Sequence, residues 1–419
     1  MAGALEGIRV LEFSEIIAAP LAGMMLADMG AEVIKVEPPW GESWRLNLQF
    51  VPLESRGFIA VNRGKRSLPL DLTKPEARAI AHQLARDVDV VLVNYRPDVP
   101  VRLGIDYETL SAINPRLVYG EATAFGKRGP HAERPGYDII AQAVSGLMTN
   151  DQKFVDGVPS LYQATPFVDF FTGSTLASGV IAALLARERT GHGQKVETSL
   201  LVNALALQGL RSIWIEAIDA ERQADFVGDV QRMREKRRPI GEAVNRYNAF
   251  QGRRAGNQRY YYRTYATADG AIAVGCLSQP LRHRLLQVLG IEGDGSLPNT
   301  GPTDADQGRM AEAAKVIAGK TTAEWVAAFD AAKVPAGPLQ FAEELWEDPQ
   351  VVANDMAVEV EHALIGKVRM ASSFTRMSET QAELRVASPA LGEHVSEILR
   401  ELGYSESQIE ALRRGGVTA

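Results

Sequence analysis

Cysteine and histidine are scarce in this chain. Its 419 residues include one cysteine, Cys276, and six histidines, no two of which are four residues apart. A single cysteine cannot form a disulfide within the chain or a zinc site built from several thiolates. Without an H-x-x-x-H spacing, the histidines lack the helical pair that many catalytic zinc sites use. We therefore predict neither a disulfide framework nor a metal centre.

Long hydrophobic runs and an excess of positive charge are missing as well. The sequence has no stretch of about 18 uninterrupted apolar residues, which a membrane-spanning helix would need. Its N-terminus lacks the basic segment and apolar core of an export signal. The net charge is −7, which gives no electrostatic basis for binding nucleic acid. We expect a cytoplasmic protein that binds neither membrane nor nucleic acid.

The start of the chain alternates strand-like and helix-like segments. Residues 8–13, 31–37 and 90–94 resemble short buried strands, and residues 20–30 and 74–89 resemble helices between them. This alternation predicts a parallel sheet with right-handed crossovers, as in Rossmann-like α/β domains. The turn after the first strand, SEIIAAP, lacks the G-x-G-x-x-G pattern of dinucleotide sites. A nicotinamide or flavin dinucleotide is therefore disfavoured.

The length favours two domains, because one hydrophobic core rarely serves 419 residues. Residues 220–258 are polar, basic and interrupted by glycine, as linkers and surface excursions are. Two strand candidates follow in residues 260–276, joined by the turn signal Asp269-Gly270. Helix candidates at 280–290 and 322–334 complete a second α/β unit, and the C-terminal tail carries two more helices.

One carboxylate, Asp169, stands in the apolar stretch PFVDFFTG, ahead of a helix of small residues expected from Ser174. As a helix cap, Asp169 would accept backbone N–H groups. As a nucleophile, it would need limited hydration and a fixed direction. Its ordinary pKa near 3.9 would leave it ionised at neutral pH without a partner base. The local sequence leaves both roles open.

Seven stretches, in this order along the chain, carry a resemblance to one enzyme family. They are GIRVLEFSEIIAAPLAGMMLADMGAEVIKVEPP, NRGKRSLPLDL, LVNYRPDV, RPGYDIIAQAVSG, VDFFTGSTLASGVIAALLARERTGHGQ, KVPAGPL and LGEHVSEILRELG. Together they resemble the class III CoA-transferases, the CaiB/BaiF family, over nearly the whole length. In that family the nucleophile is the aspartate ahead of the Thr-Gly that opens the long helix, and the matching residue here is Asp169.

The resemblance implies that CoA moves from an acyl-CoA donor to a carboxylic acid. The intermediates would be anhydrides and a CoA thioester on Asp169, with CoA as a substrate and no permanently bound cofactor. CoA contacts are implied in loops after predicted strands, where ligands of open α/β sheets bind. The predicted CoA-binding residues are Ile17, Ala18, Leu70, Asp71, Leu72, Thr73, Asn94, Tyr95, Arg96, Arg102, Tyr137 and Asp138.

From the residues alone, Arg96 and Arg102 are equally compatible with solvated surface positions, and Tyr95 and Tyr137 with core aromatics. The chain also departs from the family pattern at three places. Pro38 stands where many members have arginine. Thr73 stands where lysine is frequent, with Lys74 one residue later. The sequence FQGRRAGNQ, residues 250–258, replaces the glycine run that forms a lid in some members.

Three alternatives to transfer between separate acids remain. Related α-methylacyl-CoA racemases carry a catalytic histidine where this chain has Tyr137, a poor base at neutral pH, and His131 lies in a loop segment upstream. Intramolecular CoA transfer would use the same nucleophile. A non-enzymatic CoA-binding protein would not need Asp169. For the acids, C4–C5 dicarboxylates are the expectation, with carnitine-like and oxalate-like acceptors open, and the basic candidates are Arg253, Arg254 and Arg263.

The resemblance also implies an architecture. A large Rossmann-like CoA-binding domain would comprise residues 1–220 and 345–419, and a smaller α/β domain residues 259–333. Residues 221–258 and 334–344 would be linkers. Members of the family form interlocked homodimers, each chain threading through the other, and we expect the same here.

Overall fold

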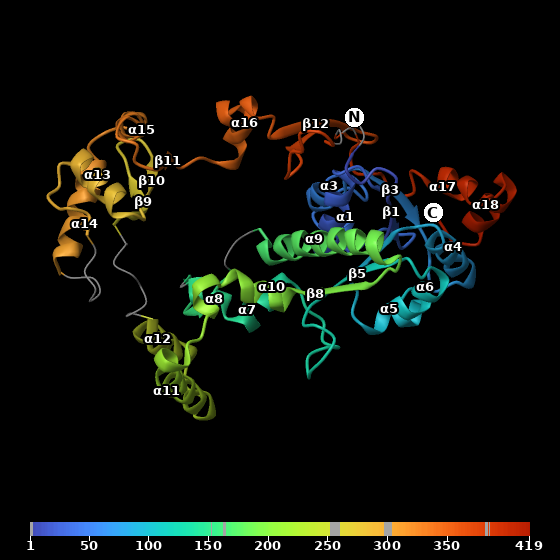
Figure 1. The fold of residues 1–419 in the computed structure, drawn as a ribbon, viewed down its shortest axis with the longest axis horizontal. Helices are drawn as coiled ribbons and strands as arrows, with labels where there is room; N and C mark the ends of the chain where they lie inside the picture. Colours follow the sequence, from blue (N-terminus) through green and yellow to red (C-terminus); the bar gives the residue numbers. More distant parts are fainter. Residues whose placement is uncertain are drawn as a thin grey trace. The chain divides into compact units, whose positions relative to one another are not determined.

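The protein is described from a computed structural model. The structure describes residues 3–151, 153–161, 165–251, 260–296, 304–381, 384 and 386–419. The chain forms two compact units (Figure 1). The first comprises Met1–Trp214 and Val352–Ala419, and the second comprises Ile215–Val351.

The first unit is built on a parallel sheet whose strand order is β3-β2-β1-β4-β5-β8. Its strands are β1 (Arg9–Phe13), β2 (Glu32–Glu37), β3 (Lys65–Pro69), β4 (Val90–Val93), β5 (Val118–Thr123) and β8 (Lys195–Ser199). This is the order of doubly wound dinucleotide-binding sheets, in which the winding direction reverses between β1 and β4. The predicted Rossmann-like α/β fold is therefore confirmed.

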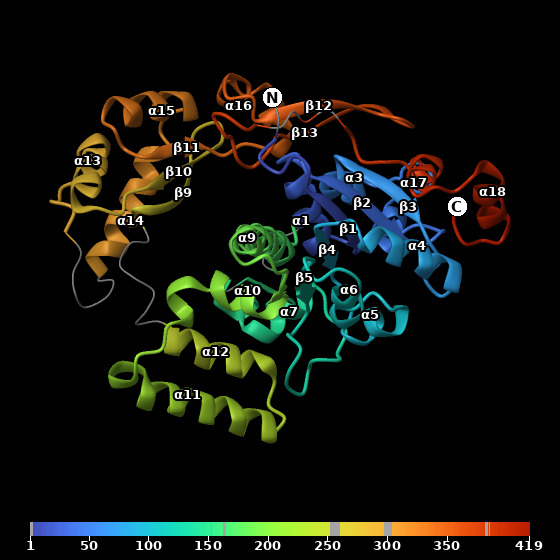
Figure 2. The ribbon, with the colours of Figure 1, turned by 45° about the vertical axis from the view of Figure 1, so that its right-hand side comes forward.

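Helices cover both faces of this sheet (Figure 2). One face carries α1 (Ala18–Ala27) and α9 (Phe167–Thr190); the other carries α4 (Pro75–Ala85), α6 (Tyr107–Ile113), α17 (Val395–Glu401) and α18 (Glu406–Arg414). Successive strand residues point to opposite faces, so Val10 packs under α1 and α9 whereas Leu11 and Phe13 pack under α4. Because the C-terminal helices share the core of α4, both ends of the chain build one domain.

Smaller elements of the first unit and its border surround the sheet. They are α2 (Ser43–Leu46), α3 (Arg56–Asn62), α5 (Asp98–Leu103), α7 (Asp138–Ser145), α8 (Leu147–Asp151), β6 (Phe154–Val155), β7 (Val158–Pro159), α10 (Leu200–Leu207), η1 (Gly209–Ser212), α16 (Pro349–Ala353), β12 (Ala357–His362) and β13 (Gly366–Ala371). The β12–β13 hairpin packs against α3, where Ile59 contacts Val360 and Met370.

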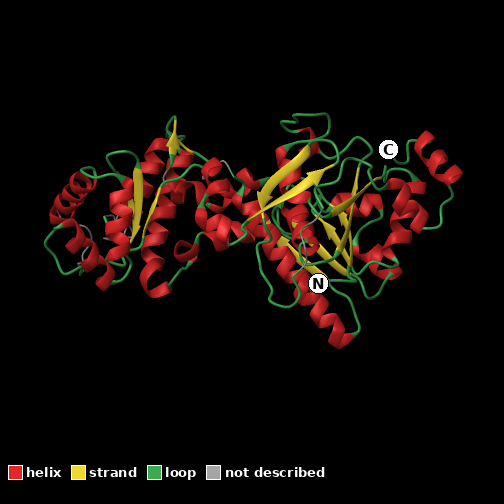
Figure 3. Ribbon diagram, turned by 90° about the horizontal axis from the view of Figure 1, so that it is seen from above, coloured by secondary structure: helices red, strands yellow, loops and turns green. Residues whose placement is uncertain are grey.

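The second unit has an antiparallel sheet of its own, in the order β11-β10-β9. Figure 3 shows its strands beside helices. Its elements are α11 (Glu216–Glu235), α12 (Ile240–Gln251), β9 (Tyr262–Ala266), β10 (Ala271–Gly275), α13 (Gln279–Leu289), α14 (Asp304–Ile317), α15 (Thr322–Ala331), β11 (Ala336–Pro338) and η2 (Ala342–Glu347). Its core includes the stacked rings of Trp325 and Phe329.

Both segments that we predicted as linkers contain regular structure. Within 221–258, α11 and α12 form a helical pair in which Phe226 stacks on Phe250 and Arg246 contacts Asp229 at 2.6 Å. Within 334–344, β11 pairs with β10. Solvated helices have the polar composition of a linker, which explains the difference for α11 and α12; the short β11 contains glycine and proline, which are also frequent in linkers. Residues 250–258, which stand where some family members have a glycine lid, lie almost entirely outside the described residues, as do Arg253 and Arg254.

Helix α9 begins at Phe167 rather than at the predicted Ser174, so Asp169 lies within its first turn. Pro166 precedes the helix at its N-cap. By length and composition α9 is apolar enough to cross a membrane, with a mean hydropathy of 1.6, but half of that stretch is buried inside the protein. The same test is passed by core helices of globular domains, and α9 packs on the sheet as one of these.

The small residues of α9 allow it to approach α1 closely. A Cβ atom added at Gly173 would stand 2.4 Å from the carbonyl oxygen of Ala18 and 2.9 Å from the Cβ of Leu21. These atoms belong to the neighbouring helix backbone and core, which cannot move away cheaply. Gly173 therefore fixes the distance between the first turn of α9, which carries Asp169, and the start of α1.

We predict that Gly173→Ala separates α9 from α1. Overpacking of this kind costs about 1–3 kcal/mol, so the melting temperature should fall. The control is Ser178→Ala, an exposed position on the same helix, which should melt within about a degree of wild type. Equal melting temperatures for the two variants would contradict the packing argument.

Candidate active site

Two cavities meet at Asp169. The first has a volume of about 480 Å³ and the second about 460 Å³, and Ile16, Ile17, Tyr137 and Asp169 line both. All the lining residues belong to the first unit. The first cavity lies at the carboxyl ends of β1, β4 and β5, beside the point where the sheet reverses its winding. Open α/β sheets bind their ligands at that position.

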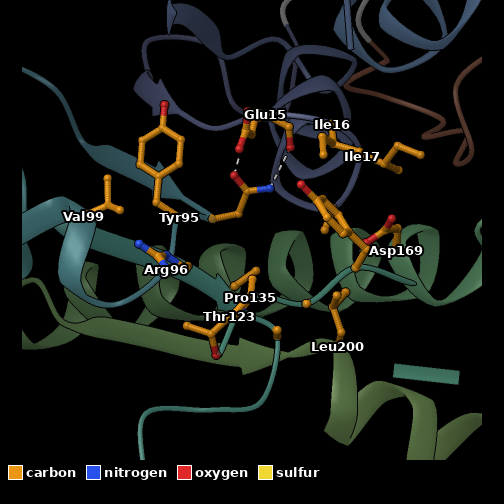
Figure 4. Close-up of a pocket in the computed structure, with 16 residues that line it drawn as sticks. Glu15, Ile16, Ile17, Tyr95, Arg96, Val99, Thr123, Pro135, Asp169 and Leu200 are labelled. Atoms are coloured by element: carbon orange, nitrogen blue, oxygen red, sulfur yellow. Dashed lines mark hydrogen bonds between the residues drawn. The ribbon is translucent and has the colours of Figure 1, made fainter. Parts of the chain in front are cut away.

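The loops that follow β1 and β4 are tied together along the wall of the first cavity. The Glu15 N–H donates to Asn94 Oδ1 at 3.0 Å, and Asn94 Nδ2 donates to the Glu15 carbonyl at 2.8 Å (Figure 4). In Figure 4, Asp169 and Leu200 lie on one side of the cavity and Arg96 and Val99 on the other. The cavity can therefore hold a ligand that extends from a basic group to the Asp169 carboxylate.

The buried carboxylate of Asp169 has no hydrogen-bond donor among the described residues. The residue is 8% exposed. The cap of α9 is instead Asp138, at the start of α7. Its Oδ2 accepts the N–H groups of Val168 at 2.9 Å and Asp169 at 3.1 Å, and its Oδ1 accepts a bond from Gln142. Since Asp138 performs the capping, the Asp169 carboxylate is left facing the two cavities.

Burial changes the acidity of Asp169. Desolvation, followed by the nearby negative charge of Asp138, raises the pKa of Asp169 to about 7. Both effects disfavour the ionised form. The expectation of a fully ionised carboxylate at neutral pH was therefore wrong, because it used the pKa of an exposed aspartate. The raised pKa means that the Asp169 carboxyl group is partly protonated near neutral pH.

A strained backbone at Ile16 forms the partition between the cavities. Ile16 has φ +68°, a conformation that β-branched residues rarely adopt and that costs about 1–3 kcal/mol. A buried ion pair holds it there. Glu42 Oε2 accepts the Ile16 N–H at 2.6 Å, and Glu42 Oε1 lies 2.9 Å from Lys35 Nζ. Lys35 also donates to the Ser14 carbonyl at 2.9 Å, so one buried lysine secures both ends of this turn.

Comparisons with known proteins identify the family. The pattern of CoA-transferase family III matches residues 5–395. The chain belongs to CoA-transferase family III. It is 33% identical to the succinate–glutarate CoA-transferase of Agrobacterium fabrum, over 95% of each chain. It is 30% identical to a formyl-CoA:oxalate CoA-transferase of Rhodopseudomonas palustris, over 100% of this chain and 98% of the other.

The fold agrees with a solved member. A CaiB/BaiF family protein from Brucella suis superposes with a TM-score of 0.73 at 29% identity, covering 96% of this chain and all of the other. The resemblance drawn from the seven sequence stretches is thus confirmed, and CoA transfer is the activity of the chain. CoA is accordingly its substrate. Among the described residues, no group of three His, Cys, Asp or Glu side chains could hold a metal ion.

Eight of the residues predicted for this CoA-transferase line the two cavities. They are Ile17, Ala18, Asn94, Tyr95, Arg96, Tyr137, Asp138 and Asp169. Arg96 is exposed and pairs with exposed Asp98 at 3.4 Å. Exposed pairs of this kind are weak, so Arg96 is available to a phosphate. Tyr95 packs partly on the core, as the simpler reading of a tyrosine suggested.

The other five predicted residues line neither cavity. Leu70 and Leu72 are buried in the core under α4, and Asp71 accepts bonds from Thr73. Lys74, the candidate for a displaced phosphate contact, donates to the carbonyls of Gly415 and Gly416 in the C-terminal tail. Arg102 is exposed on α5. Their role in binding CoA stays a prediction.

The sequence analysis did not predict some of the residues that line the two cavities of this CoA-transferase. Glu15 and Ile16 lie beside the predicted Ile17, and the rule that ligands bind after parallel strands would have included them. Thr123 ends β5, a strand that the sequence analysis did not identify. Trp44 and Asn47 of the second cavity come from α2 and its C-terminal end, far from any motif with a mechanism.

We predict that kcat/KM for acyl-CoA falls as the pH drops below about 7. The expected nucleophile is the ionised form of Asp169, and the pKa of this residue is raised to about 7. Since kcat/KM reports the free enzyme, it should fall about tenfold per pH unit below 6 and reach a plateau above 8. A profile that stays flat down to pH 5 would contradict the raised pKa.

The stability of Asp169→Asn provides an independent check. Asp169 binds its proton more tightly folded than unfolded, so wild-type stability falls as the pH rises from about 4 to 7. Asparagine does not ionise, so the variant does not lose this stability as the pH rises. With the pKa of Asp169 raised to about 7, the loss in the free energy of unfolding of wild type is at most about 4 kcal/mol. The variant should therefore unfold at higher denaturant than wild type at pH 8, with a difference that shrinks towards pH 4.

We also predict that Glu42→Gln disturbs the Ile16 turn. The substitution leaves Lys35 without its closest partner, and breaking a buried pair typically costs about 3–5 kcal/mol. Stability should fall, and kcat/KM should fall at least tenfold because the cavity partition moves. Adding Ile16→Gly should recover part of the stability, since glycine takes positive φ without strain. Wild-type kinetics in Glu42→Gln would show that this pair does not position the loop.

Proposed function

We propose that Asp169 is the nucleophile and carries the three covalent intermediates of CoA transfer, two anhydrides and one CoA thioester. The carboxylate attacks the thioester carbonyl of the donor, forming an aspartyl–acyl anhydride and releasing the CoA thiolate. The thiolate attacks the aspartyl carbonyl, which frees the donor acid and leaves CoA bound to Asp169 as a thioester. The acceptor carboxylate attacks this thioester. The returning thiolate then takes the acceptor acyl group from the second anhydride and restores Asp169.

The position of one carboxylate between two cavities supports this proposal most directly. Asp169 is buried, accepts no hydrogen bond from the described residues and lines both spaces. One cavity can hold the CoA arm while the other holds the acyl group. The CoA thiolate and the acid can therefore leave from and return to Asp169 without occupying the same space. Each step trades species of similar energy, and the enzyme's contribution is mainly positioning and stabilisation of oxyanions.

Racemisation is less well supported. A racemase needs a second base opposite the carboxylate, and no histidine lines either cavity among the described residues. Tyr137, in the position of the racemase histidine, is 58% exposed, and its phenol is a poor base. Intramolecular transfer between two carboxyls of one acid would use Asp169 in the same way, so it is the second candidate.

The names of the relatives do not agree on one class of acid for this chain. The Agrobacterium relative is named for succinate and glutarate, which supports the expected C4–C5 dicarboxylates, whereas the Rhodopseudomonas relative is named for formyl-CoA and oxalate. The acid class of this chain must therefore be argued from its own cavity. An interlocked homodimer and a cytoplasmic location remain predictions from the sequence.

Exchange of labelled acid tests the proposal. Acyl-CoA donors are incubated with their own ¹⁴C-labelled free acids, and label in the thioester is measured. Wild type should incorporate label. Asp169→Asn cannot form an anhydride and should lose at least about 10³-fold in rate. The matched control is Asp87→Asn, an exposed carboxylate after α4, which should keep wild-type activity.

Two outcomes would redirect the proposal. If CoA moves within a diacid without any label entering from solution, transfer is intramolecular. If Asp169→Asn stays folded and active, Asp169 is not the nucleophile. Hydroxylamine treatment of the enzyme with acyl-CoA should in addition yield a hydroxamate at residue 169, detectable by peptide mass.

A further inference from the structure

The second cavity beside Asp169 is mainly apolar. Trp44, Ile139, Leu161 and Pro166 line it, together with the shared residues of the partition between the cavities. These side chains come from α2, α7 and the segment before α9. Its volume of about 460 Å³ lies in the range of small-molecule sites. The cavity contains the one carboxylate that the transfer reaction needs, so it is placed to receive the acyl group.

The charged groups that face this cavity are all negative. Among the described residues, its lining contains no lysine, arginine or histidine, and its two ionisable acids are Asp138 and Asp169. Asp138 is already occupied by the backbone of α9. The lining thus offers a negative charge to anything that enters.

Two buried basic residues close to this lining in sequence, Arg45 and Lys35, are committed elsewhere. Arg45 follows Trp44 directly, but its guanidinium is fully buried, 2.8 Å from Glu37 and 3.2 Å from Glu54. Lys35 is likewise fully buried against Glu12 and Glu42. Neither lines the cavity. Removing either from its acid partners would leave a buried carboxylate unpaired, so these cations are not free to turn towards a ligand.

This cavity distinguishes acids by the chemical group at the end of the molecule opposite the reacting carboxyl. A second carboxylate would lose hydration and meet two acidic side chains without a cation, which is strongly unfavourable. A methyl, branched or aromatic end would exchange water for Trp44, Ile139 and Leu161, which is favourable in proportion to the apolar area buried.

We propose that the second cavity binds the acyl group and that the acids of this CoA-transferase are monocarboxylic with an apolar aliphatic or aromatic body. This rests on the proposed role of Asp169, and it replaces the dicarboxylates expected from the sequence. The feature that carries it is the juxtaposition of an apolar wall with two carboxylates, in a lining that contains no lysine, arginine or histidine among the described residues of the first unit.

Matched pairs of acyl-CoA donors test the proposal. Pentanoyl-CoA is compared with glutaryl-CoA, and hexanoyl-CoA with adipyl-CoA; each pair has the same number of carbons and differs in a terminal methyl or carboxylate. Phenylacetyl-CoA adds an aromatic body. With one common acceptor acid, kcat/KM should favour the apolar member of each pair at least tenfold.

Two variants test whether the preference for apolar acyl groups arises in the second cavity. Asn47→Arg adds a cation to the lining and should shift the ratio of glutaryl-CoA to pentanoyl-CoA at least tenfold towards glutaryl-CoA. Trp44→Ala removes apolar wall and should lower kcat/KM for hexanoyl-CoA at least fivefold more than for acetyl-CoA. The control is Trp40→Ala, since Trp40 is 64% exposed and outside the cavity; its donor ratios should equal those of wild type. Circular dichroism confirms that each variant is folded.

The outcomes separate this inference from the proposed function. A preference for the dicarboxylic member of the pairs, with exchange still dependent on Asp169, would overturn the inference and leave the nucleophile intact. Donor ratios that are unchanged in folded Asn47→Arg and Trp44→Ala would also overturn it, because the acyl group would then lie elsewhere. If no donor gives exchange that depends on Asp169, both proposals fail.

Discussion

The site depends on the capping of helix α9 by Asp138 instead of by Asp169. Asp138, at the start of α7, accepts the first N–H groups of α9. An aspartate in the first turn of a helix would ordinarily be drawn to such groups itself. Because that need is met from another element, the Asp169 carboxylate has no donor among the residues that the structure describes, and it faces the two cavities. Burial raises the pKa of Asp169, and the negative charge of the same neighbour raises it further.

A second constraint lies beneath the partition between the cavities. Lys35 and Glu42 are fully buried and bind the turn that carries Ile16 at positive φ. A buried ion pair of this kind adds little net stability compared with an apolar pair. It does fix geometry, because a charge without its partner is far less stable than the pair. The strained turn thus depends on charges from β2 and the loop before α2, and it separates the two spaces that meet at Asp169.

Much of the architecture followed from local patterns. Alternating strands and helices predicted the parallel sheet. Ile17 and Asn94, predicted as CoA contacts in strand-end loops, line the first cavity, and their role in binding CoA stays a prediction. The patterns failed where composition is ambiguous. A polar, arginine-rich segment was read as a linker although it builds α11 and α12, and α9 was begun at Ser174 because its first turn is aromatic rather than small. Both errors arise because solvation and turn position are decided by neighbours in space.

The sequence by itself predicted the parallel α/β fold, the family and Asp169 as the candidate nucleophile, since periodicity and ordered motifs carry this information. Only the tertiary structure decided that Asp138 caps α9, that Asp169 is buried with a raised pKa, and that Trp44 and Ile139 share a wall with it. The physical reason is the separation along the sequence over which each effect acts. Periodicity and capping signals act within a few residues, whereas desolvation and electrostatic repulsion depend on side chains that the fold brings together from distant positions.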